Sequence, residues 1–250
     1  RDQSRALVAP RGRTAGRGGA VSAWRERVEI AGGRAVLYLG DNREIWPALG
    51  VRADAIVTDP PYGIGWAHRG GGRGLSSKRH TTPIIGDDVA FDPGPWLQRS
   101  DEIVLWGANH FAARLPHGRW LAWNKLADLA PFDSFSDVEF AWHNRRGADR
   151  IYSLLWKGLL QGEKINNGLR EHPTQKPVAL MGWCLDQAKV FAGAVVADPY
   201  MGAGSTGVAC MRRGCRFIGI EIDEGYFRTA CRRIGEAARQ PDLLIPETAA

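Results

Sequence analysis

The chain has 250 residues, of which 44% are hydrophobic and 24% are charged, a composition typical of globular proteins. This length suits one well-buried α/β domain and is too short for two large ones. Its apolar runs are shorter than the ~20 residues of a membrane span. Residues 1–20 lack the apolar core of a secretory signal peptide. We therefore expect neither a membrane segment nor a secretory leader.

The formal net charge of +6 suits a polyanionic partner. Five Arg and one Asp in residues 1–20 supply +4 of that charge. A Gly/Arg-rich segment of this kind favours a disordered extension over a specific binding element. We therefore expect residues 1–27 to be a basic tail, and the folded part to be only mildly basic.

Short apolar runs alternate with amphipathic segments along the rest of the chain. In chain order, the patterns predict strands at 34–39, 53–58, 102–107, 119–123, 137–143, 194–198 and 216–221. They predict helices at 42–49, 177–191, 205–213 and 225–238. This alternation indicates one α/β domain over 28–240, with a doubly wound, mostly parallel sheet that binds ligands at the carboxyl ends of its strands.

Three segments do not fit the alternation. Residues 64–86 are rich in Gly, Arg, Lys and Ser and predict a mobile loop, residues 144–171 are polar and irregular, and 241–250 form a C-terminal tail. The cysteines lack C-x₂-C spacing and have no histidine at ligand spacing. The expectation is buried, reduced thiols in a cytoplasmic protein, with no metal site; they are Cys184, Cys210, Cys215 and Cys231.

The segment after the expected strand 194–198 is rich in glycine. Gly202 and Gly204 allow a sharp turn close to a ligand, and the next helix offers free N–H groups. A phosphate-binding P-loop would need a Lys that this segment lacks. A dinucleotide site with the pattern G-x-G-x-x-G remains open at this point, because Gly207 fits the third position.

Two acidic residues at strand ends favour a different cofactor. The carboxylate of Asp198 would repel a pyrophosphate but attract the ammonium of a methionine moiety. Glu221 ends the following strand, where a carboxylate can accept hydrogen bonds from a ribose diol. The alternative is that both carboxylates cap helices.

A third strand is needed to complete such a pocket, and the run 34–39 is the available piece. Asp41 would then lie near the adenine end of the cofactor. The alternative role for Asp41 is the N-cap of the helix 42–49.

Asp59-Pro60-Pro61-Tyr62 follows the expected strand 53–58. The Asp59 carboxylate and the Pro60 carbonyl can accept both N–H bonds of a planar amine, which favours a pyramidal, nucleophilic nitrogen. The two prolines make these acceptors rigid, and Tyr62 offers a flat face for an unstacked base. The alternative is a plain Pro-Pro turn.

The loop 64–86 supplies candidate substrate contacts. A base in a duplex must be flipped out to reach such a pocket, and basic side chains in the loop can then hold phosphates. The alternative is a solvated loop without such a role. We single out Trp66, Arg69, Lys78 and Arg79.

These motifs together resemble the DNA amino-methyltransferases that act on adenine N6 or cytosine N4. The segment 171–177, Glu-His-Pro-Thr-Gln-Lys-Pro, is similar to that family's cofactor-side motif. Because the tetrad precedes it and the glycine loop follows, the order resembles the permuted β-type arrangement over residues 35–235. The resemblance implies a Rossmann-like fold that uses S-adenosyl-L-methionine.

The same resemblance assigns site residues. It implies substrate contacts by Asp59, Pro60 and Tyr62, and places two residues near the methionine carboxylate, Thr174 and Lys176. The remaining cofactor contacts belong to the glycine loop and the next strand end: Asp198, Tyr200 (where the family usually has Phe), Gly202, Gly204, Thr206 and Glu221.

Asp at the first tetrad position favours adenine N6 as the target within this family. Cytosine N4 is the first alternative, and RNA or a protein amide is a further one. Fewer than 30 residues separate 143 from 171, where sequence-specific relatives often carry a target-recognition domain. Site recognition is therefore expected to be loose or to depend on a homodimer or a partner such as a cognate restriction endonuclease.

Overall fold

The computed structural model describes residues 22–65, 85–130, 136–157, 160–161 and 175–240. Within them, a nine-stranded sheet has the order β1-β2-β11-β10-β3-β4-β6-β5-β7. Its strands are β1 Glu26–Ile30, β2 Ala35–Leu39, β3 Ala53–Thr58, β4 Ser100–Trp106, β5 Arg119–Asn124, β6 Val138–His143, β7 Arg150–Ser153, β10 Val195–Asp198 and β11 Arg216–Glu221. A separate pair joins β8 Trp156–Lys157 to β9 Leu160–Gln161.

The middle of the sheet is parallel, as the sequence predicts. Strands β2, β11, β10, β3 and β4 all run in the same direction. Antiparallel pairing occurs where β1 joins β2 and where β6 lies between β4 and β5. The N-terminal strand β2 pairs with the C-terminal strand β11, with Ala35 opposite Phe217, so the expected third strand of the pocket is confirmed.

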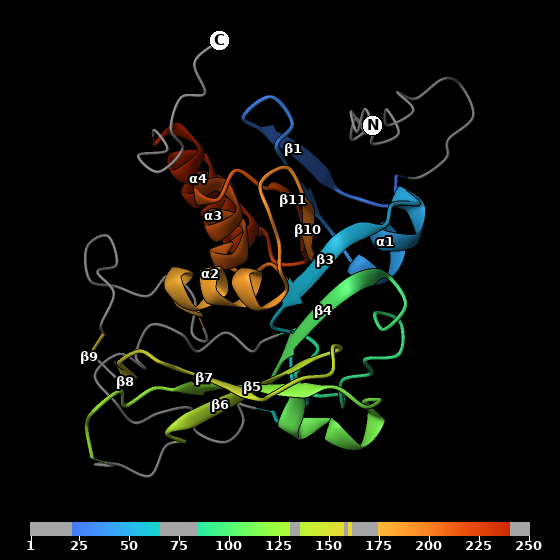
Figure 1. Cartoon of the computed structure of the whole chain (residues 1–250). Coiled ribbons are helices and arrows are strands. Elements are labelled where there is room, and N and C mark those ends of the chain that lie inside the picture. The colour runs from blue at the N-terminus through green and yellow to red at the C-terminus, as the bar shows by residue number, and fades with distance from the viewer. Residues whose placement is uncertain (1–21, 66–84, 131–135, 158–159, 162–174, 241–250) are drawn as a thin grey trace, which may run out of the picture.

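Helices cover both faces of the sheet, which makes it doubly wound (Figure 1). Alternate residues of each central strand face opposite layers. Ala35, Leu37 and Leu39 pack with α2, α3 and α4, whereas Val36 and Tyr38 pack with α1. The helices are α1 Asn42–Leu49, α2 Val178–Gln187, α3 Ser205–Arg212 and α4 Glu224–Arg239, and two 3₁₀ turns, Ala108–His110 and Ala112–Arg114, follow β4.

Several boundaries differ from the sequence expectation. Strand β1 begins at Glu26, inside the segment 1–27 expected to be a tail, because it pairs with β2. Strand β7 lies in the segment expected to be irregular, because it pairs with β5. Helix α2 ends at Gln187 instead of 191: Lys189 has a φ of +51°, and the Val190 N–H bonds to the Leu185 carbonyl in a Schellman end.

The cysteines are free, and all but the half-buried Cys231 are buried, as the sequence predicts. Burial raises the pKa of the Cys184 thiol to about 12.

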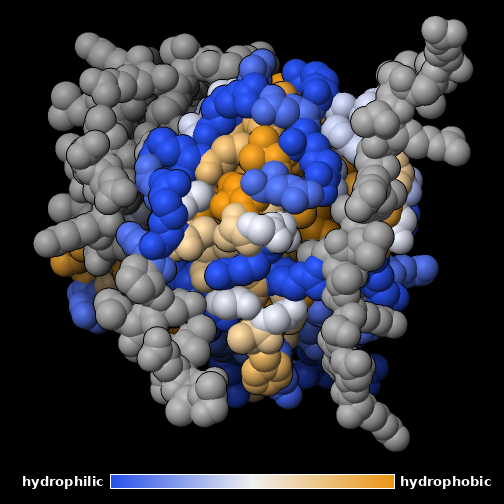
Figure 2. Space-filling model, turned by 90° about the horizontal axis from the view of Figure 1, so that it is seen from above, coloured by the Kyte–Doolittle hydropathy of each residue, from blue (hydrophilic) through white to orange (hydrophobic). Residues whose placement is uncertain are grey.

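On the face seen in Figure 2, hydrophilic residues surround a smaller apolar area.

Candidate active site

Four acidic residues meet at one edge of the sheet. Asp198 and Glu221 end the neighbouring strands β10 and β11, while Asp59 and Asp41 follow β3 and β2. These four strands are parallel and adjacent in the order β2-β11-β10-β3. Their carboxyl ends therefore lie side by side, where ligands bind in sheets of this type.

The glycine loop between β10 and α3 is held against β11. Gly202 and Gly204 have φ values of +52° and +79°, conformations that glycine adopts without strain. The Gly202 N–H donates to Glu221 Oε2 at 2.7 Å. Gly207 serves packing, because a Cβ there would overlap Ile234 of α4.

Asp198 is buried, with 3% of its surface exposed. Its Oδ1 accepts the Thr58 hydroxyl at 2.6 Å and the Tyr200 N–H at 3.1 Å. Burial raises the pKa of Asp198 to about 6, although hydrogen bonds from Thr58 and Thr206 oppose the rise. Helix α3 begins at Gly204 without a side-chain cap, so the helix-capping alternative for Asp198 is wrong.

Glu221 is buried too and accepts two backbone N–H groups, from Gly202 and from Asp223 at 2.8 Å. Burial raises the pKa of Glu221 to about 7. The cap of α4 is Asp223, which accepts the Tyr226 N–H, so Glu221 is not a helix cap either. Among the described residues, neither Asp198 nor Glu221 forms a salt bridge.

Asp41, in contrast, does cap a helix. It accepts the Arg43 N–H at 2.8 Å at the start of α1 and pairs with the Arg43 guanidinium. The hydrogen bond from the Arg43 side chain lowers the pKa of Asp41. The capping alternative is therefore confirmed, while a cofactor contact by Asp41 stays a prediction.

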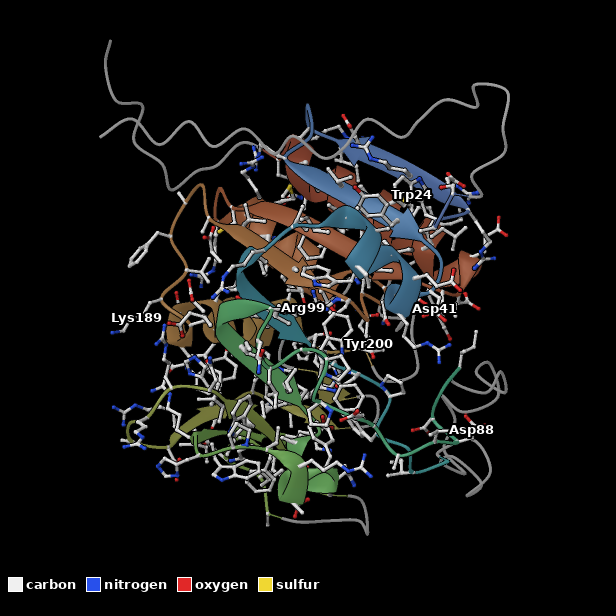
Figure 3. All side chains as sticks on the ribbon, turned by 90° about the vertical axis from the view of Figure 1, so that its right-hand side faces the viewer. Trp24, Asp41, Asp88, Arg99, Lys189 and Tyr200 are labelled. Atoms are coloured by element: carbon white, nitrogen blue, oxygen red, sulfur yellow. The ribbon has the colours of Figure 1, made fainter. Side chains whose placement is uncertain are left out.

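Tyr200 is partly buried and packs against the apolar cluster that includes the buried residues of α1. Its ring makes edge contacts with Phe91 and Trp96, each with a centroid distance of 5.8 Å. The Asn42 amide donates to the Pro199 carbonyl at 2.7 Å, which ties the loop to α1. Figure 3 shows Tyr200 near the middle of the view and Asp41 further to its right.

In the Asp59-Pro60-Pro61-Tyr62 tetrad, the first and last residues are hydrogen-bonded to each other. Tyr62 Oη donates to Asp59 Oδ1 at 2.5 Å, and the Tyr62 ring stacks on His110 with centroids 5.2 Å apart. Lys176 Nζ donates to Asp59 Oδ2 at 2.6 Å and lies 3.1 Å from Tyr62 Oη. Burial raises the pKa of Asp59 despite these partners. A plain Pro-Pro turn does not account for such a network.

A family model for N6/N4 methyltransferases, described as DNA methylase, matches residues 97–232, more than half of the chain. The chain belongs to this DNA methylase family. The chain is 38% identical over 227 residues to "Putative methylase YubD" of Escherichia coli (strain K12), covering 80% of this chain and 92% of the relative. An 80-residue match, also 38% identical, links it to the type II methyltransferase M2.DpnII of Streptococcus pneumoniae, and covers 32% of this chain and 29% of that protein.

A solved structure shares the fold of this DNA methylase. PvuII DNA methyltransferase, described as cytosine-N4-specific, superposes with a TM-score of 0.54 at 12% identity, covering 86% of this chain and 88% of the other. The predicted Rossmann-like methyltransferase fold is thus confirmed.

Within the described ranges, no helix is long and apolar enough to cross a membrane, and no cluster of three His, Cys, Asp or Glu residues is arranged to hold a metal.

Lys176 contacts the tetrad and Glu139. Its ammonium lies between Asp59 Oδ2 and Glu139 Oε2, which is 3.2 Å away, and the predicted contact of Lys176 with the methionine carboxylate stays a prediction. Burial by itself would lower the pKa of Lys176. The carboxylates of Asp59 and Glu139 outweigh that effect and raise the pKa well above its usual value.

Sequence reasoning missed several residues of the DNA methylase site. Glu139 sits on β6 on the same face as Ala141 and His143, both buried, so a carboxylate at an inward position was the available clue. His110 carried no such clue. Asp87 accepts the N–H groups of Gly63 and Ile64 at 3.0 and 3.2 Å and thereby holds the chain directly after the tetrad.

Other predicted residues lie outside the part of the chain that the structure describes. Thr174 of the predicted cofactor motif is one of them, and so are the predicted substrate contacts Trp66, Arg69, Lys78 and Arg79. Their roles in the DNA methylase stay predictions.

Proposed function

We propose that this DNA methylase transfers the methyl group of S-adenosyl-L-methionine to the N6 amine of an adenine flipped out of DNA. The observation that carries the proposal is the hydrogen bond from Thr58 to Asp198. Thr58 directly precedes the tetrad, and Asp198 directly precedes the glycine loop. The amine-holding group and the proposed cofactor-binding acid are therefore joined through one 2.6 Å contact.

The residues at the strand ends fit this cofactor. Asp198 and Glu221 are buried carboxylates without a cation partner among the described residues, and burial makes their ionised forms costly. An ammonium beside Asp198 and ribose hydroxyls donating to Glu221 would offset that cost. The turns at Gly202 and Gly204 let the backbone approach the ligand, with Tyr200 and Thr206 beside them. Bound there, the cofactor supplies an electrophilic methyl group on its sulfonium.

In this proposal the tetrad binds and activates the target amine. Asp59 and the Pro60 carbonyl accept its N–H bonds, which concentrates the nitrogen lone pair toward the methyl group. As the nitrogen gains the methyl, which would leave the sulfonium as a neutral thioether, the nitrogen loses one proton. We assign the Asp59 carboxylate to receive that proton before it passes to water. Pro61 keeps the turn rigid, and Tyr62 supports the base by stacking.

The target and the partners are the finer part of the proposal. Adenine is favoured because the tetrad begins with Asp. The loop 64–86 is proposed to cover the flipped nucleotide with basic side chains. A homodimer or a cognate restriction endonuclease would supply the site recognition that the short segment 144–171 does not.

The test is methylation with tritiated S-adenosylmethionine on DNA, RNA and protein, followed by nucleoside analysis. We expect N6-methyladenine in DNA. Label in N4-methylcytosine, in RNA or in protein alone would instead replace the proposed target with that alternative.

Asp59→Ala tests the role of the tetrad. We expect transfer to be abolished while cofactor binding, measured by calorimetry, stays close to wild type, because Asp59 serves the amine rather than the cofactor. Asp101→Ala is the matched control, since Asp101 is 68% exposed at the start of β4, the opposite edge of the sheet. Lost cofactor binding in Asp59→Ala would contradict the assignment.

A further inference from the structure

The Lys176 ammonium is shared between two carboxylates. It is 2.6 Å from Asp59 Oδ2 and 3.2 Å from Glu139 Oε2, and the Lys176 side chain is only 5% exposed. Charge-assisted hydrogen bonds between an ammonium and a carboxylate typically have N···O distances of about 2.7–2.9 Å. Lys176 is therefore bound mainly to Asp59, and Glu139 is a second, slightly more distant partner.

The Glu139 carboxylate has an oxygen and a charge with which it can bind the Lys176 ammonium. Its Oε1 accepts the Lys125 ammonium at 3.1 Å, whereas its Oε2 is buried and accepts no hydrogen bond from the described residues. Burial would raise the pKa of Glu139, but Lys176 and Lys125 outweigh it and lower the pKa to about 2. Glu139 is thus ionised at neutral pH, with an oxygen available on the side that faces Lys176.

The arrangement at Asp59 conflicts with its proposed role. Tyr62 is bound to Oδ1 and Lys176 to Oδ2, so a target amine has to share an oxygen with one of these donors. A neutral amine is a weaker donor than an ammonium, so it competes poorly while Lys176 stays in place. Removing the ammonium from the site altogether would leave a buried carboxylate unpaired, at a high cost in free energy.

We propose that Glu139 is a positioning residue that takes over the Lys176 ammonium when the target amine enters, so that Asp59 Oδ2 is free to accept the amine N–H. Glu139 is within reach of the ammonium, because the present separation of 3.2 Å is only about 0.5 Å longer than a short charge-assisted hydrogen bond. The number of buried charges is the same before and after. The inference rests on the proposed function, since it assigns a role within the same methyl transfer.

Glu139→Gln tests the handover. The amide lacks the charge that attracts Lys176, so the ammonium stays on Asp59. We expect kcat to fall about 10- to 100-fold, with the KM for DNA and the Kd for the cofactor within about twofold of wild type. Glu236→Gln is the matched control, because it removes a carboxylate from the Arg232–Glu236 pair on the surface of α4. A kcat within twofold of wild type in Glu139→Gln would overturn the inference.

A double-mutant cycle separates this role from a structural one. If Glu139 acts only through Lys176, then Glu139→Gln costs nothing further in a Lys176→Met background. A purely structural role predicts that the two losses add, and that result would overturn the inference. Glu139→Asp keeps the charge on a shorter side chain and should restore part of the kcat, which gives a second measurement if Glu139→Gln folds poorly.

One measurement does not depend on activity. The pKa of Asp59, followed by ¹³C NMR in the protein without DNA, should fall in Glu139→Gln, because Glu139 no longer repels the Asp59 charge and no longer competes for the ammonium. The other titratable groups acting on Asp59 are Lys176, Tyr62 and Asp198, and all three are retained. An unchanged Asp59 pKa would overturn the inference even if the wild-type enzyme methylates another target, whereas absence of N6-methyladenine contradicts only the proposed function.

Discussion

Tyr62 owes its position to a glycine that lies outside the tetrad. Gly107 follows β4 with a φ of +67°, and a Cβ at this position would overlap the ring of Tyr62. The hydroxyl of that ring is bound to Asp59, and His110 stacks on one of its faces. The ring therefore sits in a slot whose width depends on the missing side chain of Gly107.

Gly107→Ala should accordingly damage catalysis more than stability. The added methyl must push Tyr62 away from Asp59, so we expect kcat to fall about 100-fold while cofactor binding persists. Gly50→Ala is the control: Gly50 has a similar φ of +58°, and a Cβ added there would have no neighbouring atom within 4 Å, so this variant carries the strain of about 1–2 kcal/mol without the overlap. Equal activities of the two variants would contradict the proposed slot.

At the scale of elements, the site depends on how each helix begins. Asp41 caps α1 and Asp223 caps α4 with side-chain oxygens, whereas α2 and α3 start with no side-chain cap. The N-terminal N–H groups of α3 are therefore not taken by a capping side chain, which leaves them available to the proposed cofactor. The capped helices hold the two sides of the loop, through Asn42 on α1 and through the close packing of Gly204 against α4.

Asp41 allows capping and cofactor binding to be measured separately. Asn caps helices as well as Asp does, so Asp41→Asn should keep the free energy of unfolding within about 0.5 kcal/mol, while Asp41→Ala should lose about 0.5–2 kcal/mol. If the proposed cofactor contact exists, both variants bind S-adenosylmethionine more weakly. Chemical denaturation and calorimetry check the two effects, and an Asn variant as unstable as the Ala variant would contradict the capping role.

At the scale of the whole molecule, the buried carboxylates at the proposed cofactor edge of the sheet lower the stability of the native state. Asp198 and Glu221 have pKa values raised by burial to about 6 and about 7, above the values of about 4 in an unfolded chain. The native state therefore binds more protons than the unfolded state between about pH 4 and 7, and stability falls as pH rises through this window. Glu139, with its lowered pKa, stabilises the fold above about pH 4 and loses that contribution only toward pH 2.

Asp198→Asn should reverse part of this loss. We expect the ligand-free variant to be more stable than wild type at pH 8 by up to about 3 kcal/mol, with the difference vanishing toward pH 4, and to bind the cofactor weakly. Unfolding free energies across pH 4–8 provide the measurement. Asp186→Asn, at an exposed position on α2, should leave the pH dependence unchanged. A variant that is destabilised equally at all pH values would show that Asp198 is structural.

The local patterns of the sequence determined much of this protein. Apolar runs marked the central strands, and the residues that follow them marked the site, because the carboxyl ends of parallel strands share one edge. The pairing of β2 with β11 also followed, since a pocket at Asp198 and Glu221 needs a third strand. Edge strands such as β1 and β7 were missed, because their residues gain their conformation from a partner strand and carry only a weak pattern of their own.

Only the tertiary structure decided which side chains meet. Asp59 and Lys176 are 117 positions apart, and their hydrogen bond forms only because the fold brings these two segments together. Glu139 joins them only because β6 lies beside β4 in one register. The sequence by itself determined the chemistry available at the strand ends. The packing of distant segments decided the partner of each charge, because burial and distance set the strength of an ion pair and no local pattern records either.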